Sequence, residues 1–462
     1  MLFNSIGYIF FFITVLALFS ALSPFWTARK CMLLLASYFF YMMWSPPFAL
    51  LLLGSTLLDY TAGNIIAKTP SLRTKKLWVL ISCVGNLGVL SFFKYGAFIT
   101  ENVWNVIPAL SDPPAIFTGI ILPVGISFYT FQSLSYTIDV YRDSKLKSDS
   151  FLDFALYVSF FPQLVAGPIV RAGTLLPQFR EKHNPNSQDI MRGIDLIARG
   201  FAKKILIADT LAIYVDMVYA NPDFYGAVNQ LVAIYAYAFQ IYMDFSGYSD
   251  IAIGSALLLG FKLPENFRLP YMAQSPSDFW RRWHISLSTW LRDYLYISLG
   301  GSRSSNLKTY RNLLITMVLG GLWHGAAWGF VLWGCFHGLW LAIHRILCVD
   351  NSYIKIPKWL SIFITFHLVC FGWICFRAPS WDVLTSVITQ FANFSIPVYA
   401  IPLDVLVCLG LAFLSHLLGS VTFLVSYWNN LSFVYKVNWY ALLTVVIFFR
   451  ASAQQQFIYF QF

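Results

Sequence analysis

Apolar runs about as long as a bilayer is thick recur along this chain, and they constrain its fold more than any other feature. A helix needs about 20 mostly apolar residues to cross a hydrocarbon core of about 30 Å. The clearest runs are Ile6–Leu22, Leu33–Trp44, Phe48–Ile66, Leu77–Ile99, Ala115–Ile138, Ala227–Tyr242, Leu313–Leu347, Leu360–Phe376 and Val405–Val421. Weaker runs are Ile205–Tyr219, Ile251–Leu259 and Tyr440–Phe449. Together they predict an all-α polytopic membrane protein with about ten to twelve embedded helices.

Composition agrees with a lipid environment. Of the 462 residues, 58% are hydrophobic and only 11% are charged, whereas a soluble domain carries about 25% charged residues. A single hydrophobic core in water could not bury so much apolar surface, because soluble chains of this length divide into domains with polar surfaces. We find no repeat and no long linker, so we expect one embedded domain over residues 1–462, with its motifs at about 115–347.

Basic residues predict the orientation of the chain. The first apolar run has no basic segment before it and no small-residue cleavage site after it, so we interpret it as the first span. The basic residues that follow spans one, three and five are Arg29, Lys30, Lys68, Arg73, Lys75, Lys76, Arg142, Lys145 and Lys147. The alternate connections, 45–47 and 101–114, contain no Lys or Arg. The positive-inside rule then places the N-terminus outside, and the net charge of +10 needs no nucleic acid to explain it.

The segment Leu313–Leu347 is longer than one crossing requires, so it must bend or break. Gly320, Gly321 and Gly325 surround His324 near its middle. Desolvation favours the neutral, proton-accepting form of an imidazole. Ionisable groups inside a membrane are costly, so their presence there usually indicates a function. His324 is therefore a candidate general base. An equally weighted alternative is that His324 only donates a hydrogen bond to a backbone carbonyl that the kink leaves without its helical partner.

His284 lies in a segment whose start resembles a capped helix. Ser275 is a suitable N-cap and Pro276 a suitable first residue. Aromatic and aliphatic residues then recur at helical spacing as far as Tyr294, which predicts an amphipathic helix with His284 on its buried face, near the cytoplasmic interface. A packed core histidine is the alternative, with about equal weight.

Other polar residues carry weaker predictions. Asp244 and Asp250 either orient an imidazole or a substrate hydroxyl, or cap a helix that starts near 246–249. His337 and His344 are seven residues apart, about 10.5 Å along a helix, which is too far for a shared zinc ion, so we interpret them as packing residues. No metal site, phosphate loop or nucleophile elbow is present in the sequence. Proline and glycine interrupt residues 151–297, where we expect a cavity.

Six motifs, taken together, resemble the membrane-bound O-acyltransferase family, and in particular its bacterial branch of alginate O-acetyltransferase type. They are LPVGISFYTFQ (122–132), FPQLVAGPI (161–169), YMDFSGYSD (242–250), ENFRLPY (265–271), FWRRWHISLSTWLRDY (279–294) and GLWHGA (321–326). The resemblance implies a ring of tilted helices around a thin core with a central cavity or tunnel. It also places the family's invariant histidine at His324 and its second motif histidine at His284.

This resemblance further implies transfer of an acyl group, usually acetyl, from a cytoplasmic donor to an extracytoplasmic glycan. We expect no bound cofactor; acetyl-CoA or an acyl carrier protein serves as the donor. Expected partners are membrane lipid, the polysaccharide acceptor and a periplasmic or cell-surface acetyltransferase, and the expected location is the bacterial inner membrane. From the motifs we take these residues as candidates to line the substrate tunnel: Asp244, Ser249, Asn266, Trp280, Arg281 and Trp323.

Three questions stay open at this point. The acceptor is also consistent with a lipid or a protein, since the same mechanism applies. An acyl-histidine intermediate is as compatible with the residues as direct transfer with His324 as general base and His284 orienting the donor. A transporter or glycan-export channel is a weaker alternative, because transporters usually have related halves with paired broken helices, and no such pair is present here.

Overall fold

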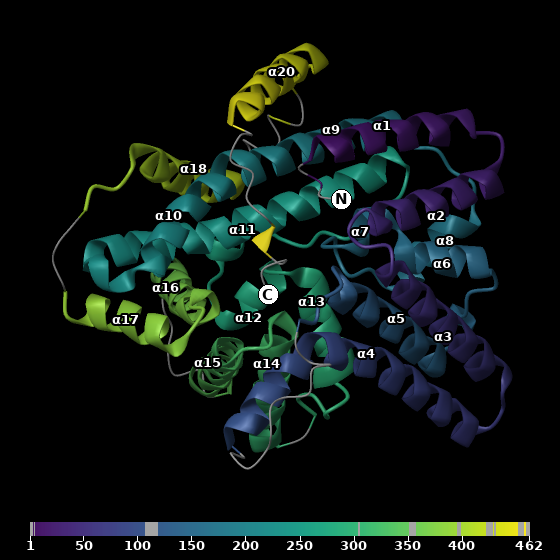
Figure 1. Cartoon of the computed structure of the whole chain (residues 1–462), viewed down its shortest axis with the longest axis horizontal. Coiled ribbons are helices and arrows are strands. Elements are labelled where there is room, and N and C mark those ends of the chain that lie inside the picture. Colours follow the sequence, from purple (N-terminus) through teal and green to yellow (C-terminus); the bar gives the residue numbers. More distant parts are fainter. Residues whose placement is uncertain are drawn as a thin grey trace. The chain divides into compact units, whose positions relative to one another are not determined.

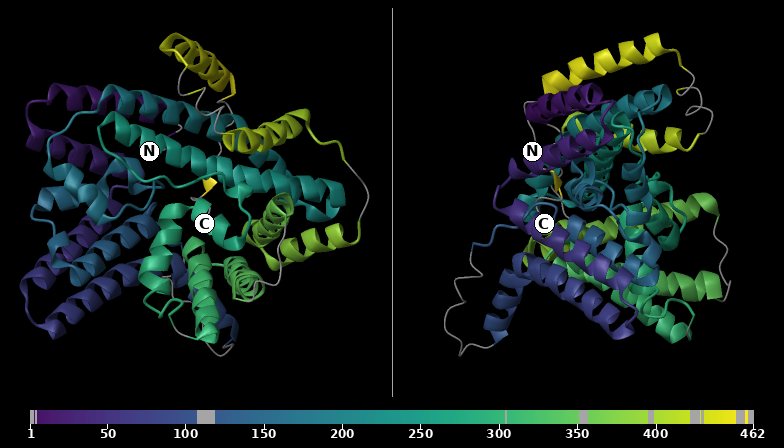
Figure 2. Two further views of the ribbon diagram at one scale, coloured as in Figure 1. Left: turned by 180° about the vertical axis from the view of Figure 1, so that it is seen from behind. Right: turned by 90° about the vertical axis from the view of Figure 1, so that its right-hand side faces the viewer.

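The computed structural model describes residues 3, 5–106, 119–303, 305–350, 357–394, 399–421, 428, 431–450 and 457–458. These residues form helices and connections without a strand, which confirms the all-α prediction (Figures 1 and 2). Four of the described helices are long and apolar enough to cross a membrane: Phe48–Lys68, Leu72–Trp104, Trp328–Leu347 and Lys358–Arg377. Shorter apolar helices are Ile6–Ala21, Leu403–Gly419 and Val434–Ile447. The chain is thus a multi-pass membrane protein, while the full number of embedded helices stays a prediction.

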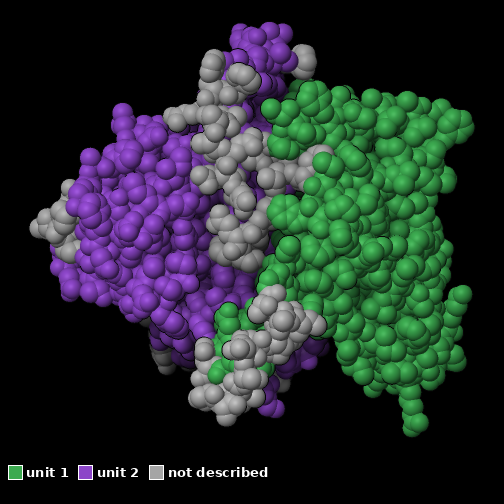
Figure 3. Space-filling view, in the orientation of Figure 1, with its two compact units in different colours: residues 1–197, 251–264 green, residues 198–250, 265–462 purple. Residues whose placement is uncertain are grey.

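The described chain divides into two compact units, coloured separately in Figure 3. Unit 1 comprises Met1–Ile197 and Ile251–Pro264, and unit 2 comprises Ala198–Asp250 and Glu265–Phe462. Two helices contribute residues to both units: α9 (Ser187–Phe201) and α11 (Ala227–Leu258). The single embedded domain remains a prediction.

Unit 1 contains the first eight helices. They are α1 (Ile6–Ala21), α2 (Trp26–Met42), α3 (Phe48–Lys68), α4 (Leu72–Val106), α5 (Ile126–Arg142), α6 (Phe151–Ser159), α7 (Phe161–Leu164) and α8 (Ala172–Arg180). The buried carboxylate of Asp59 on α3 accepts hydrogen bonds from Ser82 at 2.5 Å, Asn86 at 2.8 Å and Thr137 at 2.8 Å. These donors come from α4 and α5, so the carboxylate of Asp59 joins three helices. In a bilayer such polar contacts help helices associate, because apolar side chains are equally well accommodated by lipid.

The predicted run Ala115–Ile138 differs from the structure. Residues 107–118 lie outside the described part, and helix α5 begins only at Ile126, after Gly125. Gly125 has a φ of 76°, and a Cβ there would lie 2.7 Å from the carbonyl oxygen of Leu164. Glycine is required at this position both for the left-handed backbone and for the close approach of the two segments.

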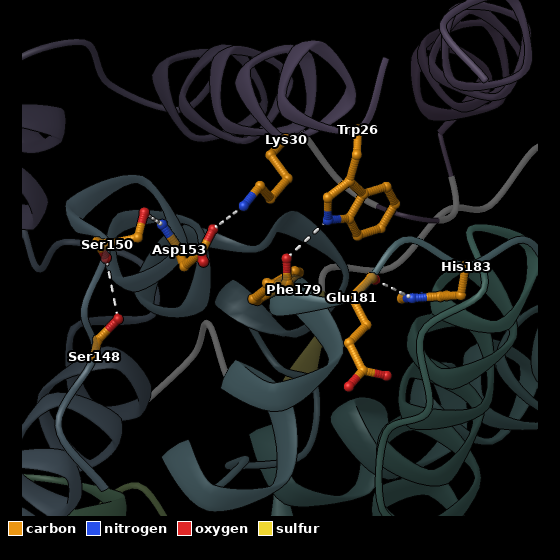
Figure 4. Close-up of polar contacts among 8 residues, drawn as sticks. All are labelled: Trp26, Lys30, Ser148, Ser150, Asp153, Phe179, Glu181 and His183. Carbon is orange, nitrogen blue, oxygen red and sulfur yellow. Dashed lines mark hydrogen bonds and ion pairs between the residues drawn. The ribbon is translucent and has the colours of Figure 1, made fainter. Parts of the chain in front are cut away.

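Arg29 and Lys30 follow helix α1 in the chain, but they lie within α2 and not in the connection between the two helices. Both side chains are buried, and hydrogen bonds satisfy their charged groups. Lys30 donates to Asp153 at 2.5 Å, and Arg29 donates to the carbonyl of Phe19 at 2.7 Å. Figure 4 shows the Lys30–Asp153 pair beside Trp26, whose indole donates to a backbone carbonyl of α8. These two cations serve packing within unit 1, and the outward N-terminus stays a prediction.

Unit 2 holds the remaining helices. They are α10 (Asp209–Ala220), α12 (Pro276–Arg282), α13 (Ile285–Trp290), α14 (Asn306–His324), α15 (Trp328–His344), α16 (Lys358–Arg377), α17 (Trp381–Ala392), α18 (Leu403–Gly419) and α20 (Phe433–Arg450). π-Helical segments occupy Ala202–Ala208, Leu291–Tyr296 and Arg345–Asp350. Helix α11 continues without a break through residues 246–249, so the predicted helix start there is wrong and neither Asp244 nor Asp250 caps one.

The long run Leu313–Leu347 breaks as predicted. Helix α14 ends at His324, and α15 begins at Trp328 and packs against α14. A Cβ at Gly321 would lie 2.2 Å from the carbonyl oxygen of Phe330, so the two helix backbones approach more closely than any side chain at 321 allows. This close approach sets the position of His324 at the end of α14.

Candidate active site

His284 lies at a break between two short helices. Ser275 caps α12 as predicted, because its hydroxyl accepts from the backbone N–H of Asp278 at 3.1 Å. The predicted continuous helix is wrong, however: α12 ends at Arg282 and α13 begins at Ile285. His284 has a φ of 42° and a ψ of 55°, a left-handed conformation that few non-glycine residues adopt. Such strain persists only where the surrounding contacts fix the backbone, as they often do at functional sites.

Asn266 supplies those contacts. Its backbone carbonyl accepts from the N–H of Ile285 at 2.9 Å. Its side-chain Oδ1 accepts from the backbone N–H of Ser286 at 3.2 Å and from the Ser286 hydroxyl at 2.9 Å. Its Nδ2 donates to the hydroxyl of Ser249 on α11 at 3.2 Å. Asn266 therefore fastens the broken segment around His284 to the long helix α11.

The same amide determines which imidazole nitrogen carries the proton. A backbone N–H is always a donor, so the Ser286 contact identifies the facing Asn266 atom as the oxygen. His284 Nδ1 lies 3.2 Å from that oxygen and must donate to it. Complete burial lowers the pKa of His284 to about 3, so the ring is neutral at ordinary pH. Nε2 is then its proton-accepting atom.

His324 is the last residue of α14 and is only 3% exposed. Aromatic rings surround it: the centroid distances are 5.0 Å to Trp323, 5.2 Å to Trp333 and 5.1 Å to Phe376. The ring therefore faces the protein interior rather than lipid. The predicted central tunnel beside it stays a prediction.

Trp323 links the two histidines. Its ring centroid lies 5.9 Å from that of His284 and 5.0 Å from that of His324, and both contacts are edge-to-face. Phe245 on α11 lies on another side of His284, with a centroid distance of 4.7 Å. His284 and His324, which are 40 positions apart in the chain, therefore both contact the Trp323 indole, as their assignment to one site requires.

The other predicted site residues divide into two groups. Ser249, Asn266 and Trp323 belong to the cluster around the histidines. Asp244 instead forms a buried ion pair with Lys204 at 2.9 Å and accepts from the backbone N–H of Ile458 at 2.7 Å. Its role in the structure is to join the π-helical segment 202–208 to α11.

Trp280 and Arg281 lie on α12, in the segment before His284. Trp280 packs against Trp333, with a centroid distance of 5.6 Å, and against His337, at 5.2 Å. Arg281 is exposed at the end of α12, so only Trp280 points into the aromatic cluster. Trp280 therefore adjoins the environment of His324 through Trp333.

Sequence reasoning missed several residues of this site. Ser286 holds the amide of Asn266, and Phe376 and Trp333 enclose His324. Phe376 follows the motif block by some 50 residues, in a helix that looked like an ordinary span, so no sequence signal identified it. Lys204, by contrast, was detectable as a cation directly before the apolar run Ile205–Tyr219, because a buried amine needs an acidic partner.

The arrangement is suited to proton transfer in a place that excludes water. Two buried imidazoles contact one indole, and one of them is held neutral with a defined acceptor nitrogen. Among the residues that the structure describes, no group of three or more His, Cys, Asp or Glu side chains is placed to hold a metal ion. Acid–base chemistry at the imidazoles is what these residues offer.

Comparison with protein-family models matches residues 140–378 to the membrane-bound O-acyltransferase family, MBOAT. The matched region contains His284, His324 and every other predicted site residue. The chain is also similar to the probable alginate O-acetylase AlgI of Pseudomonas aeruginosa, with 47% identity over 359 residues, which is 77% of this chain and 68% of the relative. The corresponding protein of Azotobacter vinelandii is 44% identical over 387 residues, covering 83% of this chain and 76% of the relative.

Another relative, whose name specifies a different acceptor, aligns with a similar share of this chain. The peptidoglycan O-acetyltransferase of Helicobacter pylori is 38% identical over 384 residues, which is 76% of this chain and 72% of the relative. The relatives therefore share a transfer reaction and differ in the glycan that their names specify.

Proposed function

The chain belongs to the membrane-bound O-acyltransferase family and is a multi-pass membrane acyltransferase, and we propose that it transfers acetyl groups to hydroxyls of an extracytoplasmic polysaccharide. The observation that carries the proposal is the contact of Trp323 with both buried histidines. The names of the relatives, which specify alginate and peptidoglycan, support a glycan acceptor. Among glycans, alginate is favoured by the higher identity to the alginate O-acetylases.

His324 is the general base in this proposal. It takes the proton of the acceptor hydroxyl as the hydroxyl oxygen bonds to the acyl carbon, and the carbon–sulfur bond of the thioester breaks. The proton then passes to the departing thiolate, so the reaction yields an ester and a thiol. Positioned base catalysis contributes about 10²- to 10⁴-fold to the rate. Alignment of the two substrates and exclusion of water contribute the rest.

His284 orients the donor in this scheme. Because Asn266 holds its Nδ1 proton, Nε2 is an acceptor and suits a donor group that offers an N–H or O–H. Its left-handed backbone keeps the ring fixed relative to Trp323. Direct transfer needs only these two rings, so we favour it over an acyl-histidine intermediate.

The donor in this proposal is a cytoplasmic thioester, either acetyl-CoA or an acetylated carrier protein, and no resident cofactor takes part. We place the enzyme in the bacterial inner membrane with its N-terminus outside. Acetyl groups reach the polysaccharide directly or through a periplasmic or cell-surface acetyltransferase. Family membership supports an acyltransferase over the transporter alternative, and acylation of a lipid or a protein would change only the acceptor.

The test is polysaccharide O-acetylation in cells that express His324→Ala at normal membrane abundance. The expected result is loss of ester-linked acetyl from the polysaccharide. His367→Ala is the matched control, because His367 bonds Tyr235 and the carbonyl of Phe363 and lies outside the candidate site. Full acetylation by His324→Ala would refute the catalytic assignment, and acetyl on lipid alone would move the acceptor to that class.

A further inference from the structure

The last described residues of the chain, Phe457 and Ile458, lie in the interior of unit 2. Each is only 1% exposed. The preceding helix α20 differs, because its apolar side chains, such as Val434 and Leu442, are exposed and suit contact with lipid. In Figures 1 and 2 the two residues form a short yellow piece beside α11. The chain therefore returns from an exposed helix to a buried position against α11.

A buried carboxylate holds this 457–458 segment on α11. The backbone N–H of Ile458 donates to Asp244 Oδ2 at 2.7 Å, across 214 positions in the chain. The other oxygen of Asp244, Oδ1, pairs with Lys204 at 2.9 Å. Hydrogen bonds to an ionised acceptor are about twice as strong as those between neutral groups. Because Asp244 is buried, water does not compete for Oδ2, and the bond sets which residue of the segment meets α11.

The ring of Phe457 packs on the same part of α11. Its centroid lies 4.3 Å from that of Tyr248, in a stacked arrangement, and 5.8 Å from that of Phe245. Residues three or four apart on a helix are neighbours, so positions 244, 245 and 248 form one surface. We name Asp244, Phe245 and Tyr248 the α11 face. All three belong to the motif YMDFSGYSD (242–250), and their contacts with the segment give these motif positions a role.

Phe245 connects the segment to the candidate active site. Its ring contacts that of Phe457 at 5.8 Å and that of His284 at 4.7 Å, the latter edge to face. Asn266 holds the same imidazole through Nδ1. Protein interiors are close-packed, so the loss of one ring is felt by its neighbours. Removal of the ring at 457 therefore frees Phe245 to move, and the imidazole loses a fixed contact.

We propose that the 457–458 segment holds the α11 face against His284, and that Phe457 is a positioning residue for acyl transfer that acts through Phe245. The proposal rests on the proposed function and adds a distant part of the chain to it. The partner of the α11 face is thus a segment of this same chain. Phe457 takes no part in bond making.

Phe457→Ala tests the proposal in purified full-length protein in lipid nanodiscs, with alginate oligosaccharides as acceptor. The donor is whichever of acetyl-CoA and an acetylated carrier protein the wild type uses. Misplacement of a reacting group by about 1 Å costs about 10²-fold in rate. Because His284 is displaced only through Phe245, we expect kcat per folded molecule to fall about tenfold, and KM to change less.

Two further variants control for volume and folding. Phe457→Leu fills most of the space of the ring and should restore part of kcat. It also replaces Phe457→Ala if that variant does not fold. Phe391→Ala removes a partly exposed ring on α17 and should leave kcat within about twofold of the wild type.

A double-mutant cycle separates positioning from stability. If Phe457 acts through Phe245, then Phe457→Ala should lower kcat less than twofold in a Phe245→Ala background, since the connection is already lost. In a Phe239→Leu background the two effects should multiply, because Phe239 on α11 packs instead on Tyr271 and Phe413. A segment that only stabilises the fold would give multiplied effects in both backgrounds.

Two substitutions at 458 test the bond to Asp244. Ile458→Pro removes the N–H that donates to Oδ2, whereas Ile458→Ala keeps this N–H and shortens the side chain. We expect the proline variant to lose at least fivefold more kcat than the alanine variant. Equal kcat in the two folded variants would show that the bond does not hold the segment in its working position.

The outcomes separate this proposal from the proposed function. Wild-type kcat in folded Phe457→Ala and Ile458→Pro would overturn the role of the segment and leave the proposed function intact. Multiplied effects in the Phe245→Ala background would overturn that role too. Absence of acetyl transfer by the wild type from either thioester would refute the proposed function, and the role of the segment with it.

Discussion

Asn266 Oδ1 accepts a hydrogen bond from His284 Nδ1 at 3.2 Å, across a gap of 18 positions in the chain. The amide oxygen is oriented by Ser286, so the tautomer of His284 follows from the backbone of its own segment. In this respect the site resembles catalytic arrangements in which a neighbouring polar group fixes the imidazole's proton and leaves the other nitrogen to act. The difference is that the orienting group here is neutral, and burial alone keeps the ring uncharged.

Asn266→Ala removes the three hydrogen bonds that the Asn266 side-chain oxygen accepts from His284 and Ser286. Misplacement of a reacting group by about 1 Å costs about 10²-fold in rate, so we expect acetyl transfer to fall by that order. The measurement is initial rate with acetyl-CoA at equal amounts of folded protein. Ser249→Ala removes only the bond to Nδ2 of Asn266 and should retain more than half of the activity. Equal losses in both variants would contradict the role given to Oδ1.

His284 makes folding stability depend on pH in a defined direction. Its folded pKa of about 3 lies below the ordinary value of 6.5. Below pH 6.5 the unfolded chain therefore takes up a proton that the folded chain does not, and stability falls as the pH falls. Between pH 6.5 and 5 this one group lowers the free energy of unfolding by about 2 kcal/mol.

The variant His284→Gln isolates this contribution. Glutamine keeps a donor for Asn266 and does not titrate, so its unfolding free energy should fall less between pH 6.5 and 5 than that of the wild type. Unfolding of both proteins in one detergent over this pH range measures the difference. Parallel decline in the two proteins would show that His284 is accessible to protons in the folded state.

Lys204 is the centre of a buried ion cluster. Its amine lies 2.8 Å from Asp209 and 2.9 Å from Asp244, and its side chain is 2% exposed. Removing one member of a buried pair leaves an uncompensated charge and costs about 3 to 5 kcal/mol. We therefore expect Lys204→Met to lower the thermal midpoint strongly in detergent, with catalysis per folded molecule less affected than stability.

Lys203→Met is the matched control for that variant. Lys203 pairs with Asp250 at 2.6 Å, but the two side chains are 24% and 17% exposed, so water screens the charge left behind. Its midpoint should fall by less than half as much. A double variant, Lys204→Met with Asp244→Asn, should recover part of the loss, because it removes one of the two facing charges.

The sequence predicted the all-helical class, the break in Leu313–Leu347 and the burial of His284 and His324, since these depend on hydrophobic length, glycine and helical spacing. The catalytic role of the two histidines stays a prediction. The sequence did not predict the break at His284. Residues 275–294 have helical spacing throughout, and the strained φ at His284 is stabilised by Asn266, which is distant in the sequence. The ion pair of Asp244 was not predicted for the same reason, because its partner Lys204 is 40 positions away.

Gly321 provides a test of how the meeting of two helices positions His324. A Cβ at this position would lie 2.2 Å from the Phe330 carbonyl oxygen and 3.3 Å from the Cα of Gly334, and these backbone atoms move only if α14 and α15 separate. Gly321→Ala should therefore destabilise the protein by about 1 to 3 kcal/mol, as overpacking does. It should also lower acetyl transfer more than tenfold, because His324 moves relative to Trp333. Gly410→Ala on α18 meets no atom within 4 Å and should keep activity and raise helix stability slightly. If both variants behave alike, the contact between α14 and α15 does not determine the geometry of the site.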